Sequence, residues 1–267
     1  MPRLLYGTAW KKERTGQLVL QAIRIGFRGI DTAGQPKHYD EAGVGAAVAH
    51  ALGDGLHRND LFLQTKFTPL SGQDPERIPY DPDADIATQV AQSFAVSLRN
   101  LRTTYVDSLV LHSPYRRGAH TLEAWQAMEG IVDRGGAKLI GISNCYSLRT
   151  LRALYDASRI KPAVLQNRFH AQTDYDVALR AFCRERGIVY QSFWTLTANP
   201  HLLADDTVRR LAMKYGRTPA QVLFRYLTQV DVVPLTGTTS EAHMREDLAI
   251  FEFELTDAEV KAVTALL

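Results

Sequence analysis

The sequence predicts an α/β fold, a single (β/α)8 TIM barrel over residues 1–267. Eight short runs of apolar or β-branched residues alternate with longer segments in which apolar residues recur at helical spacing. Strict alternation of this kind implies parallel strands joined by helical crossovers. The chain of 267 residues has the length that eight such units need.

The eight expected strands cover residues 4–6, 29–30, 61–65, 108–111, 139–142, 164–166, 188–191 and 230–233. The expected helices include residues 17–25, 86–101, 122–132, 178–186, 208–215, 220–228 and 256–267. Gly26, Gly53, Gly135 and Gly187 stand where helices should stop. An open dinucleotide-binding sheet is the alternative fold, but it should show a G-x-G-x-x-G run after an early strand, and none occurs.

The most irregular segment, residues 68–85, contains Pro69, Pro75, Pro79 and Pro82. This composition predicts a long loop, and long loops in compact domains are often functional. It follows the third expected strand, on the side of a barrel where active sites lie.

Composition excludes several classes of protein. The net charge of +2 does not favour nucleic acid or an acidic membrane as a partner, and a small-molecule ligand is expected instead. Two cysteines, Cys145 and Cys183, provide neither a disulfide framework nor metal-ligand spacing. No signal peptide or membrane span is apparent, so a cytoplasmic location is expected. A monomer or weak homodimer is a separate expectation.

Ionisable side chains follow three consecutive strands. Asp31 follows the second, with Tyr39 in the next loop; Lys66 ends the third and His112 the fourth. Because active-site residues of such barrels gather at the C-terminal ends of the strands, these four should meet. Each residue taken alone has an ordinary structural explanation, a turn former, a solvated lysine or a hydrogen-bonded histidine.

Together the four suit acid–base chemistry. A free tyrosine, with a pKa of about 10, is a poor proton donor at neutral pH, and a nearby ammonium lowers that pKa. Lys66 can supply the charge, Asp31 can hold Lys66, and His112 can bind a substrate oxygen. Tyr39 would then act as general acid for a carbonyl that receives hydride at carbon, which requires a nicotinamide cofactor.

Six segments, in order and at similar spacing, resemble the aldo-keto reductases: GFRGIDTA at 26–33, HYDEAGVG at 38–45, LQTKF at 63–67, LVLHSP at 109–114, GISN at 141–144 and LQNRFH at 165–170. The resemblance spans nearly the whole chain. It implies the (β/α)8 barrel, reversible NAD(P)H-dependent reduction of aldehydes or ketones, and Asp31, Tyr39, Lys66 and His112 as the catalytic tetrad. Because His112 is not replaced by Glu, it implies reduction of C=O rather than C=C.

The resemblance also implies a cofactor site. Ser143, Asn144 and Gln166 match residues that hold the nicotinamide carboxamide, and Phe193 matches the aromatic residue that stacks on the ring. The remaining expected cofactor contacts are Gly7, Thr8, Ala9, Asp31, Trp194, Thr195, Leu196, Thr236, Gly237, Thr238, Thr239, His243, Glu246 and Asp247.

Residues 233–248 depart from the family pattern. Members specific for NADPH usually carry a Lys early in this loop and an Arg further on; here Gly237 and its threonine neighbours stand near the first position and His243 at the second. The departure removes charge-assisted bonds to the 2′-phosphate, although a helix start near Ser240 can still hold phosphate. NADPH is the expected cofactor, with NADH the alternative.

The expected substrate pocket is formed by aromatic residues and the tetrad histidine: Trp10, Phe67, His112, Tyr115 and Trp194. Because the chain begins at the first strand and ends after a helix, the pocket is expected to be open. Two alternatives to a reductase stay open: a cofactor-binding, redox-sensing regulatory subunit with little turnover, and a metal-dependent hydrolase using Asp31, His112 and His170. No metal site is expected, because the H-x-H pair of such hydrolases is missing.

Overall fold

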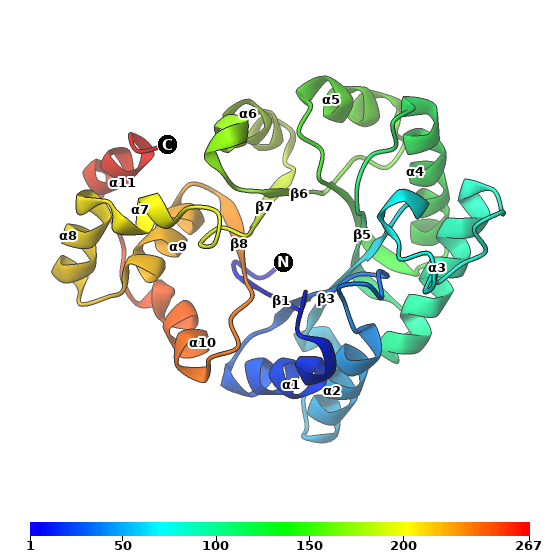
Figure 1. Cartoon of the computed structure of the whole chain (residues 1–267), viewed down its shortest axis with the longest axis horizontal. Helices are drawn as coiled ribbons and strands as arrows, with labels where there is room; N and C mark the ends of the chain where they lie inside the picture. Colours follow the sequence, from blue (N-terminus) through cyan, green and yellow to red (C-terminus); the bar gives the residue numbers. More distant parts are fainter.

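Eight parallel strands close into a barrel in the computed structural model, which describes all residues 1–267. Each strand pairs with the next in sequence, and β1 closes the ring against β8. Figure 1 shows the strands around the centre and the helices outside them. The strands are β1 (Leu5–Gly7), β2 (Gly29–Asp31), β3 (Phe62–Phe67), β4 (Val106–Leu111), β5 (Ala137–Ser143), β6 (Val164–Arg168), β7 (Val189–Phe193) and β8 (Val232–Thr236).

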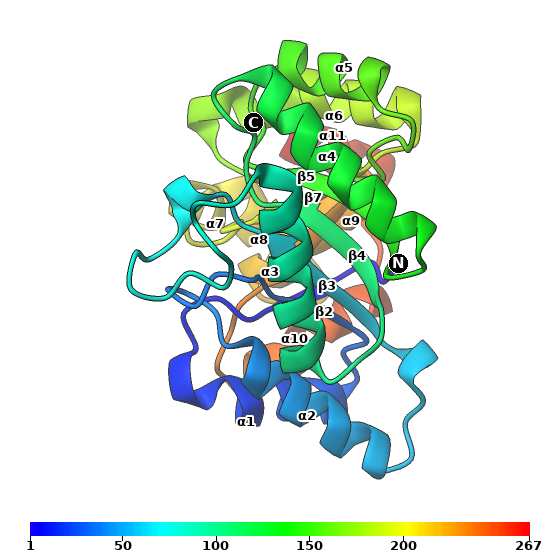
Figure 2. The same ribbon diagram turned by 90° about the vertical axis from the view of Figure 1, so that its right-hand side faces the viewer.

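Helices follow the strands and cover the outside of the barrel, as the side view shows (Figure 2). The α-helices are α1 (Thr15–Ile25), α2 (Glu41–Gly53), α3 (Ile86–Leu101), α4 (Gly118–Asp133), α5 (Leu148–Ala157), α6 (Val177–Arg186), α7 (Pro200–Ala204), α8 (Asp206–Tyr215), α9 (Pro219–Gln229), α10 (Glu241–Leu248) and α11 (Asp257–Thr264). Short 3-10 helices are η1 (Lys12–Arg14), η2 (Arg58–Asp60), η3 (Leu70–Gly72), η4 (Ala171–Asp176) and η5 (Ala249–Glu252).

The predicted (β/α)8 class is confirmed, with local differences. The last strand begins at Val232 rather than at residue 230, because Val230 caps the C-terminus of α9 and Asp231 turns with a φ of 60°. Apart from η3, the segment 68–85 has no helix or strand, as its prolines predict. Gly26, Gly135 and Gly187 have φ values of 130°, 76° and 68°, so each ends its helix in a backbone conformation that favours glycine.

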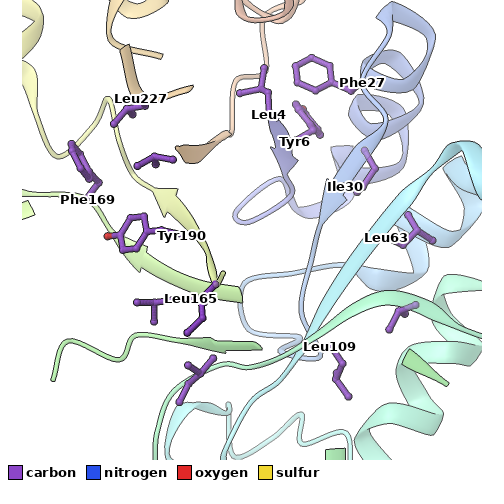
Figure 3. Close-up of a cluster of buried hydrophobic side chains, with 14 of the residues drawn as sticks. Leu4, Tyr6, Phe27, Ile30, Leu63, Leu109, Leu165, Phe169, Tyr190 and Leu227 are labelled. Carbon is purple, nitrogen blue, oxygen red and sulfur yellow. The ribbon is translucent and has the colours of Figure 1, made fainter. Parts of the chain in front are cut away.

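The main hydrophobic core lies between the barrel and its helices. Outward-facing residues of the strands, such as Ile30, Leu63, Leu109 and Leu165, meet apolar residues of the surrounding helices and loops (Figure 3). Successive residues of a strand point to opposite faces, so the alternate positions point into the barrel. This parity decides which side chains reach the candidate site.

A second, smaller apolar cluster contains Leu5, Phe62 and Leu235, with Leu139 and Phe193 packed against it. Side chains from β1, β3, β5, β7 and β8 can meet only inside the barrel, so this cluster fills its interior. A Cβ on Gly29 would lie 2.3 Å from Leu5 Cδ2, so the interior requires glycine at that position. No helix has both the length and the apolar composition needed to cross a membrane.

Candidate active site

A cavity of about 780 Å³ opens at the C-terminal ends of the strands. Its walls include Asp31, Tyr39 and His112 at one end and Glu246 and Asp247 of α10 at the other. Polar side chains from six different strands or the loops after them therefore share one elongated space. A cavity of this size and form fits a ligand of cofactor dimensions.

Asp31 and Lys66 form a buried ion pair beneath this cavity. Lys66 Nζ donates to Asp31 Oδ2 at 2.7 Å and to the carbonyl oxygen of Thr32 at 2.8 Å, and both side chains are almost fully buried. Desolvation lowers the pKa of Lys66, whereas the charge of Asp31 opposes that change. A second buried carboxyl, Glu41, lies near enough for Lys66 to lower its pKa, although burial raises it overall.

Tyr39 lies above this pair. Lys66 Nζ is 5.2 Å from the centroid of the Tyr39 ring, and the Tyr39 and His112 rings meet edge to face with centroids 6.0 Å apart. Burial, with the charge of Asp31, raises the pKa of Tyr39, so the expected lowering by Lys66 is wrong for this structure. The physical reason is burial, because removing a phenolate from water costs more than the attraction of an ammonium that is already paired with Asp31 at 2.7 Å.

His112 is held at the end of β4 by its backbone. Its N–H donates to Phe67 O at 2.8 Å, and its carbonyl oxygen accepts from Asn144 Nδ2 at 2.8 Å. Burial, together with the charges of Lys66 and His38, lowers the pKa of His112 to about 3. The imidazole is therefore neutral at physiological pH.

Three glutamines surround the other oxygen of Asp31. Oδ1 accepts from Gln64 Nε2 at 2.7 Å and from Gln166 Nε2 at 3.0 Å, and Gln191 Oε1 accepts from both of these amides. The carboxylate thus accepts from side chains of both β3 and β6. Because the side-chain oxygen of Gln166, Oε1, accepts no hydrogen bond from the protein, it stays available to an N–H donor in the cavity.

Ser143 and Asn144 continue this polar wall after β5. Ser143 Oγ donates to the backbone carbonyl oxygen of Gln166 at 2.7 Å, and Asn144 Nδ2 lies 3.3 Å from Ser143 Oγ. Asn144 has a φ of 52°, in the left-handed region that asparagine adopts more readily than most other residues. The two residues expected to hold a carboxamide therefore lie beside Gln166.

The far end of the cavity is formed by the loop after β8 and by α10. Thr236 Oγ1 donates to Asp247 Oδ2 at 2.6 Å, and burial raises the pKa of Asp247 to about 6. The Ser240 side chain caps α10 by accepting from His243 N. His243 itself is exposed, with Nδ1 3.5 Å from Thr238 Oγ1.

Cationic side chains near this end differ in availability. Arg245 is paired with Glu241 at 2.7 Å and does not reach the cavity wall. Lys11, from the loop after β1, donates to the carbonyl oxygen of Gly237 at 2.7 Å, and burial lowers its pKa to about 8. Lys11 was not among the expected site residues, because its position in the sequence gives no indication that it reaches the last loop.

Two exposed tryptophans stand at the mouth of the cavity. The ring of Trp10 stacks on His38 with centroids 3.8 Å apart, and the guanidinium of Arg168 lies 4.4 Å from the Trp194 ring centroid. Both tryptophans have positive φ, 64° and 55°. Trp10, Trp194 and His112, which were expected to line the substrate pocket, all lie on the cavity wall.

Two expected pocket residues lie elsewhere. Phe67 belongs to the main core and packs against Tyr80, with ring centroids 5.6 Å apart, because it follows the inward-facing Lys66 and so points outward. Tyr115 is fixed beside α4, where its N–H donates to Thr121 Oγ1 at 2.9 Å, and does not line the cavity.

Sixteen of the eighteen expected cofactor contacts lie on the cavity wall, and Thr8 and Thr239 do not. Thr8 is fully buried with its hydroxyl on the carbonyl oxygen of Asp31, and Thr239 points to solvent. The wall also contains residues that sequence reasoning missed: Gln35, His38, Arg168, Thr197, Thr218, Ala220, Phe224 and Leu235. No group of three or more His, Cys, Asp or Glu side chains is arranged to hold a metal ion.

Comparison with known proteins shows which family this chain resembles along its whole length. Residues 5–267 match the sequence model of the Aldo/keto reductase family. The chain is 33% identical to a probable NAD(P)H-dependent D-xylose reductase, xyl1, of Emericella nidulans, over 100% of this chain and 90% of the relative. It is 29% identical to aldo-keto reductase family 1 member A1 of Gallus gallus, over 100% of this chain and 85% of the relative.

Solved structures of proteins from the same family have the same fold as this chain. An aldo/keto reductase from Brucella melitensis superposes with a TM-score of 0.84 at 29% identity, covering 100% of this chain and 95% of the other. The Bombyx mori aldo-keto reductase AKR2E4, solved in complex with NADP, superposes with a TM-score of 0.82 at 27% identity, covering 99% and 89%. Relatives named as reductases do not favour the regulatory-subunit alternative.

Proposed function

The chain belongs to the aldo/keto reductase family and is an NAD(P)H-dependent carbonyl reductase, and we propose that Asp31, Tyr39, Lys66 and His112 are its catalytic tetrad. The observation that carries the proposal is the junction of a buried Asp31–Lys66 pair with Tyr39 and a neutral His112 on one cavity wall. A carbonyl oxygen bound between Tyr39 and His112 would meet two hydrogen-bond donors.

Tyr39 acts as the proton donor. Its raised pKa keeps the hydroxyl protonated before reaction, which a general acid requires. As the substrate oxygen gains charge, a second donor from His112 stabilises it in the water-poor base of the cavity. Lys66 then stabilises the phenolate left behind, while Asp31 keeps the ammonium in place.

The cavity fits a nicotinamide dinucleotide, which supplies hydride when bound. Gln166 Oε1 offers a free acceptor for the carboxamide, with Ser143 and Asn144 beside it, and Phe193 offers an aromatic face for the ring. Thr236, Gly237 and Thr238 form the wall toward α10, whose Ser240-capped N-terminus favours a phosphate. The other wall residues of this proposed site are Gly7, Ala9, Trp194, Thr195, Leu196, His243, Glu246 and Asp247.

NADPH is the proposed preferred cofactor, with NADH as the weaker ligand. Support comes from Lys11 and His243, two groups that can carry positive charge beside the Gly237–Thr238 turn. The substrate is a small aldehyde or ketone admitted between Trp10 and Trp194. Both tryptophans are about half exposed, so the mouth can accommodate varied side groups.

The test combines binding with turnover. The purified protein should quench or shift nucleotide fluorescence on titration with NADPH, and should oxidise NADPH in the presence of members of an aldehyde and ketone panel. Tyr39→Phe should keep the nucleotide Kd and lose about 10²–10⁴-fold in kcat, the usual contribution of a general acid. Loss of nucleotide binding in Tyr39→Phe would show that the role assigned to Tyr39 is wrong.

A further inference from the structure

The ring of His112 has one hydrogen-bond partner in the protein. Its Nδ1 lies 2.6 Å from Thr68 Oγ1, and Nε2 makes no hydrogen bond within the protein. Because Nδ1 is engaged with Thr68 and the ring lines the cavity, Nε2 is the nitrogen available to a ligand. With a pKa of about 3 the ring carries one proton at neutral pH, so the tautomer decides whether Nε2 donates or accepts.

The hydrogen bonds open to the Thr68 hydroxyl decide between the two tautomers of His112. Thr68 is 2% exposed, and its hydroxyl has no hydrogen-bond partner other than His112 Nδ1. If Nδ1–H donated to Oγ1, the hydroxyl proton would be buried without an acceptor, which is unfavourable. If the hydroxyl donates to Nδ1, both groups are satisfied and the ring proton stands on Nε2.

The orientation of Thr68 is fixed by the proline-rich loop. Its carbonyl oxygen accepts from Tyr80 Oη at 2.9 Å and from Gln73 Nε2 at 3.2 Å. A Cβ built on Gly72 would lie 2.8 Å from Thr68 Cγ2, so glycine at 72 makes room for the methyl group. Since a β-branched side chain has few χ1 choices, a methyl group held against Gly72 leaves the hydroxyl directed at His112.

We propose that Thr68 is a positioning residue that holds His112 in the Nε2–H tautomer, so that Nε2 donates to the substrate carbonyl oxygen. The catalytic consequence rests on the proposed function, whereas the tautomer itself does not. The segment 68–85 thereby acquires a defined role. Its residues Tyr80, Gln73 and Gly72 fix the orientation of Thr68, and the Thr68 hydroxyl determines which nitrogen of His112 carries the proton.

The test measures the tautomer directly, by nitrogen-15 NMR of histidine-labelled protein with NADP⁺ bound. The chain has eight histidines, and a His112→Gln sample assigns the resonances of His112. The wild type should show a protonated Nε2 and an unprotonated Nδ1. Thr68→Val, which keeps the shape and removes the hydroxyl, should shift these resonances toward a tautomer mixture and lower kcat about tenfold, with the NADPH Kd unchanged.

Two further variants separate positioning from packing. Thr68→Ser keeps the hydroxyl and should restore the tautomer and most of kcat. Gly72→Ala leaves the hydroxyl in place but crowds the Thr68 methyl group, and should shift the His112 resonances in the same direction as Thr68→Val. As a control, Thr228→Val removes another buried hydroxyl, which donates to Arg225 O at 2.8 Å on α9, and should leave kcat and the His112 spectrum unchanged.

The outcomes are distinguishable. A wild-type spectrum with the proton on Nδ1, or an unchanged tautomer in Thr68→Val, would overturn the role of Thr68 even if turnover is high. The expected tautomer without turnover of any carbonyl would instead overturn the proposed function. Equal losses of kcat in Thr68→Val and Thr68→Ser would reduce Thr68 to a packing residue.

Discussion

The two ends of the cavity are built differently. At the proposed reaction end, where the tetrad lies, Asp31 and Lys66 are almost fully buried and each polar atom has a partner from a neighbouring strand. At the far end, His243 is exposed on a capped helix, and the buried Asp247 accepts from a single side chain. A closed barrel fixes groups on its strand ends rigidly, whereas a loop and helix can change their charges without disturbing the barrel. Function at the reaction end should therefore be intolerant of substitution, and cofactor choice at the far end adjustable.

The largest expected effect comes from breaking the buried pair. Lys66→Met leaves the Asp31 carboxylate without its cation in the barrel interior and should lower the free energy of unfolding by about 3–5 kcal/mol. Turnover should fall as well, because the Tyr39 phenolate loses its neighbouring ammonium. Urea denaturation followed by circular dichroism measures the stability loss.

A double variant provides the control for this loss. Asp31→Asn with Lys66→Met removes both charges, keeps an acceptor for Gln64 and Gln166, and should be more stable than Lys66→Met alone. Turnover should stay low in both. If the double variant is the less stable of the two, the pair does not act as a coupled unit.

Much of the reaction end could be predicted from the sequence, because a barrel brings strand ends together whatever the loops do. The wrong placement of Phe67 comes from the alternation of side chains between the two faces of a strand. Phe67 was expected in the pocket because it is aromatic, yet alternation turns it outward and brings Thr68, two residues after Lys66, to the His112 side. Counting by two from Lys66 would have found Thr68.

Other contacts could not be predicted from the sequence. α2 and α5 were not among the expected helices. α2 is rich in alanine and glycine and packs against both α1 and α3, so it lacks a clear polar face.

Two long-range contacts also leave no local pattern in the sequence. Lys11 contacts Gly237, 226 residues away. Gln64 contacts Gln191, 127 residues away. These contacts depend on closure of the ring, which only tertiary structure reveals.

An intermediate effect is expected at Asp247, the buried carboxyl of the far end. Its pKa is raised from 3.8 to about 6, so between these values the folded protein binds more protons than the unfolded chain. Stability is therefore lost as pH rises through this window, by about 3 kcal/mol when the carboxyl is fully ionised. Asp247→Asn keeps an acceptor for Thr236 and should be more stable than the wild type above pH 6, with little difference below pH 4.

Denaturant midpoints of both proteins across pH 4–8 check this prediction. Since other groups titrate equally in the two proteins, only the difference between them reports Asp247. A constant difference at all pH values would mean that the carboxyl is not neutral in the folded state. The nucleotide Kd should change little between pH 5 and 8 in Asp247→Asn, whereas in the wild type it should follow ionisation of Asp247, which lies on the cavity wall.

The smallest effect, and the one that sharpens the contrast most, is a change of cofactor preference at His243. This exposed side chain stands beside Thr238 on the cavity wall, and Arg at this position offers a permanent charge and a fork of donors to a phosphate. His243→Arg should tighten NADPH about fivefold, the equivalent of about 1 kcal/mol for an exposed charge pair, and leave the Kd of NADH unchanged. The gain should shrink as salt rises from low to physiological concentration, because exposed charges are screened.

His50→Arg adds the same charge on the exposed face of α2, away from the cavity, and should alter neither Kd. An equal gain for NADPH and NADH in His243→Arg would mean that the added charge acts on the diphosphate or on the field of the whole cavity, and the 2′-phosphate would then have to lie nearer Lys11.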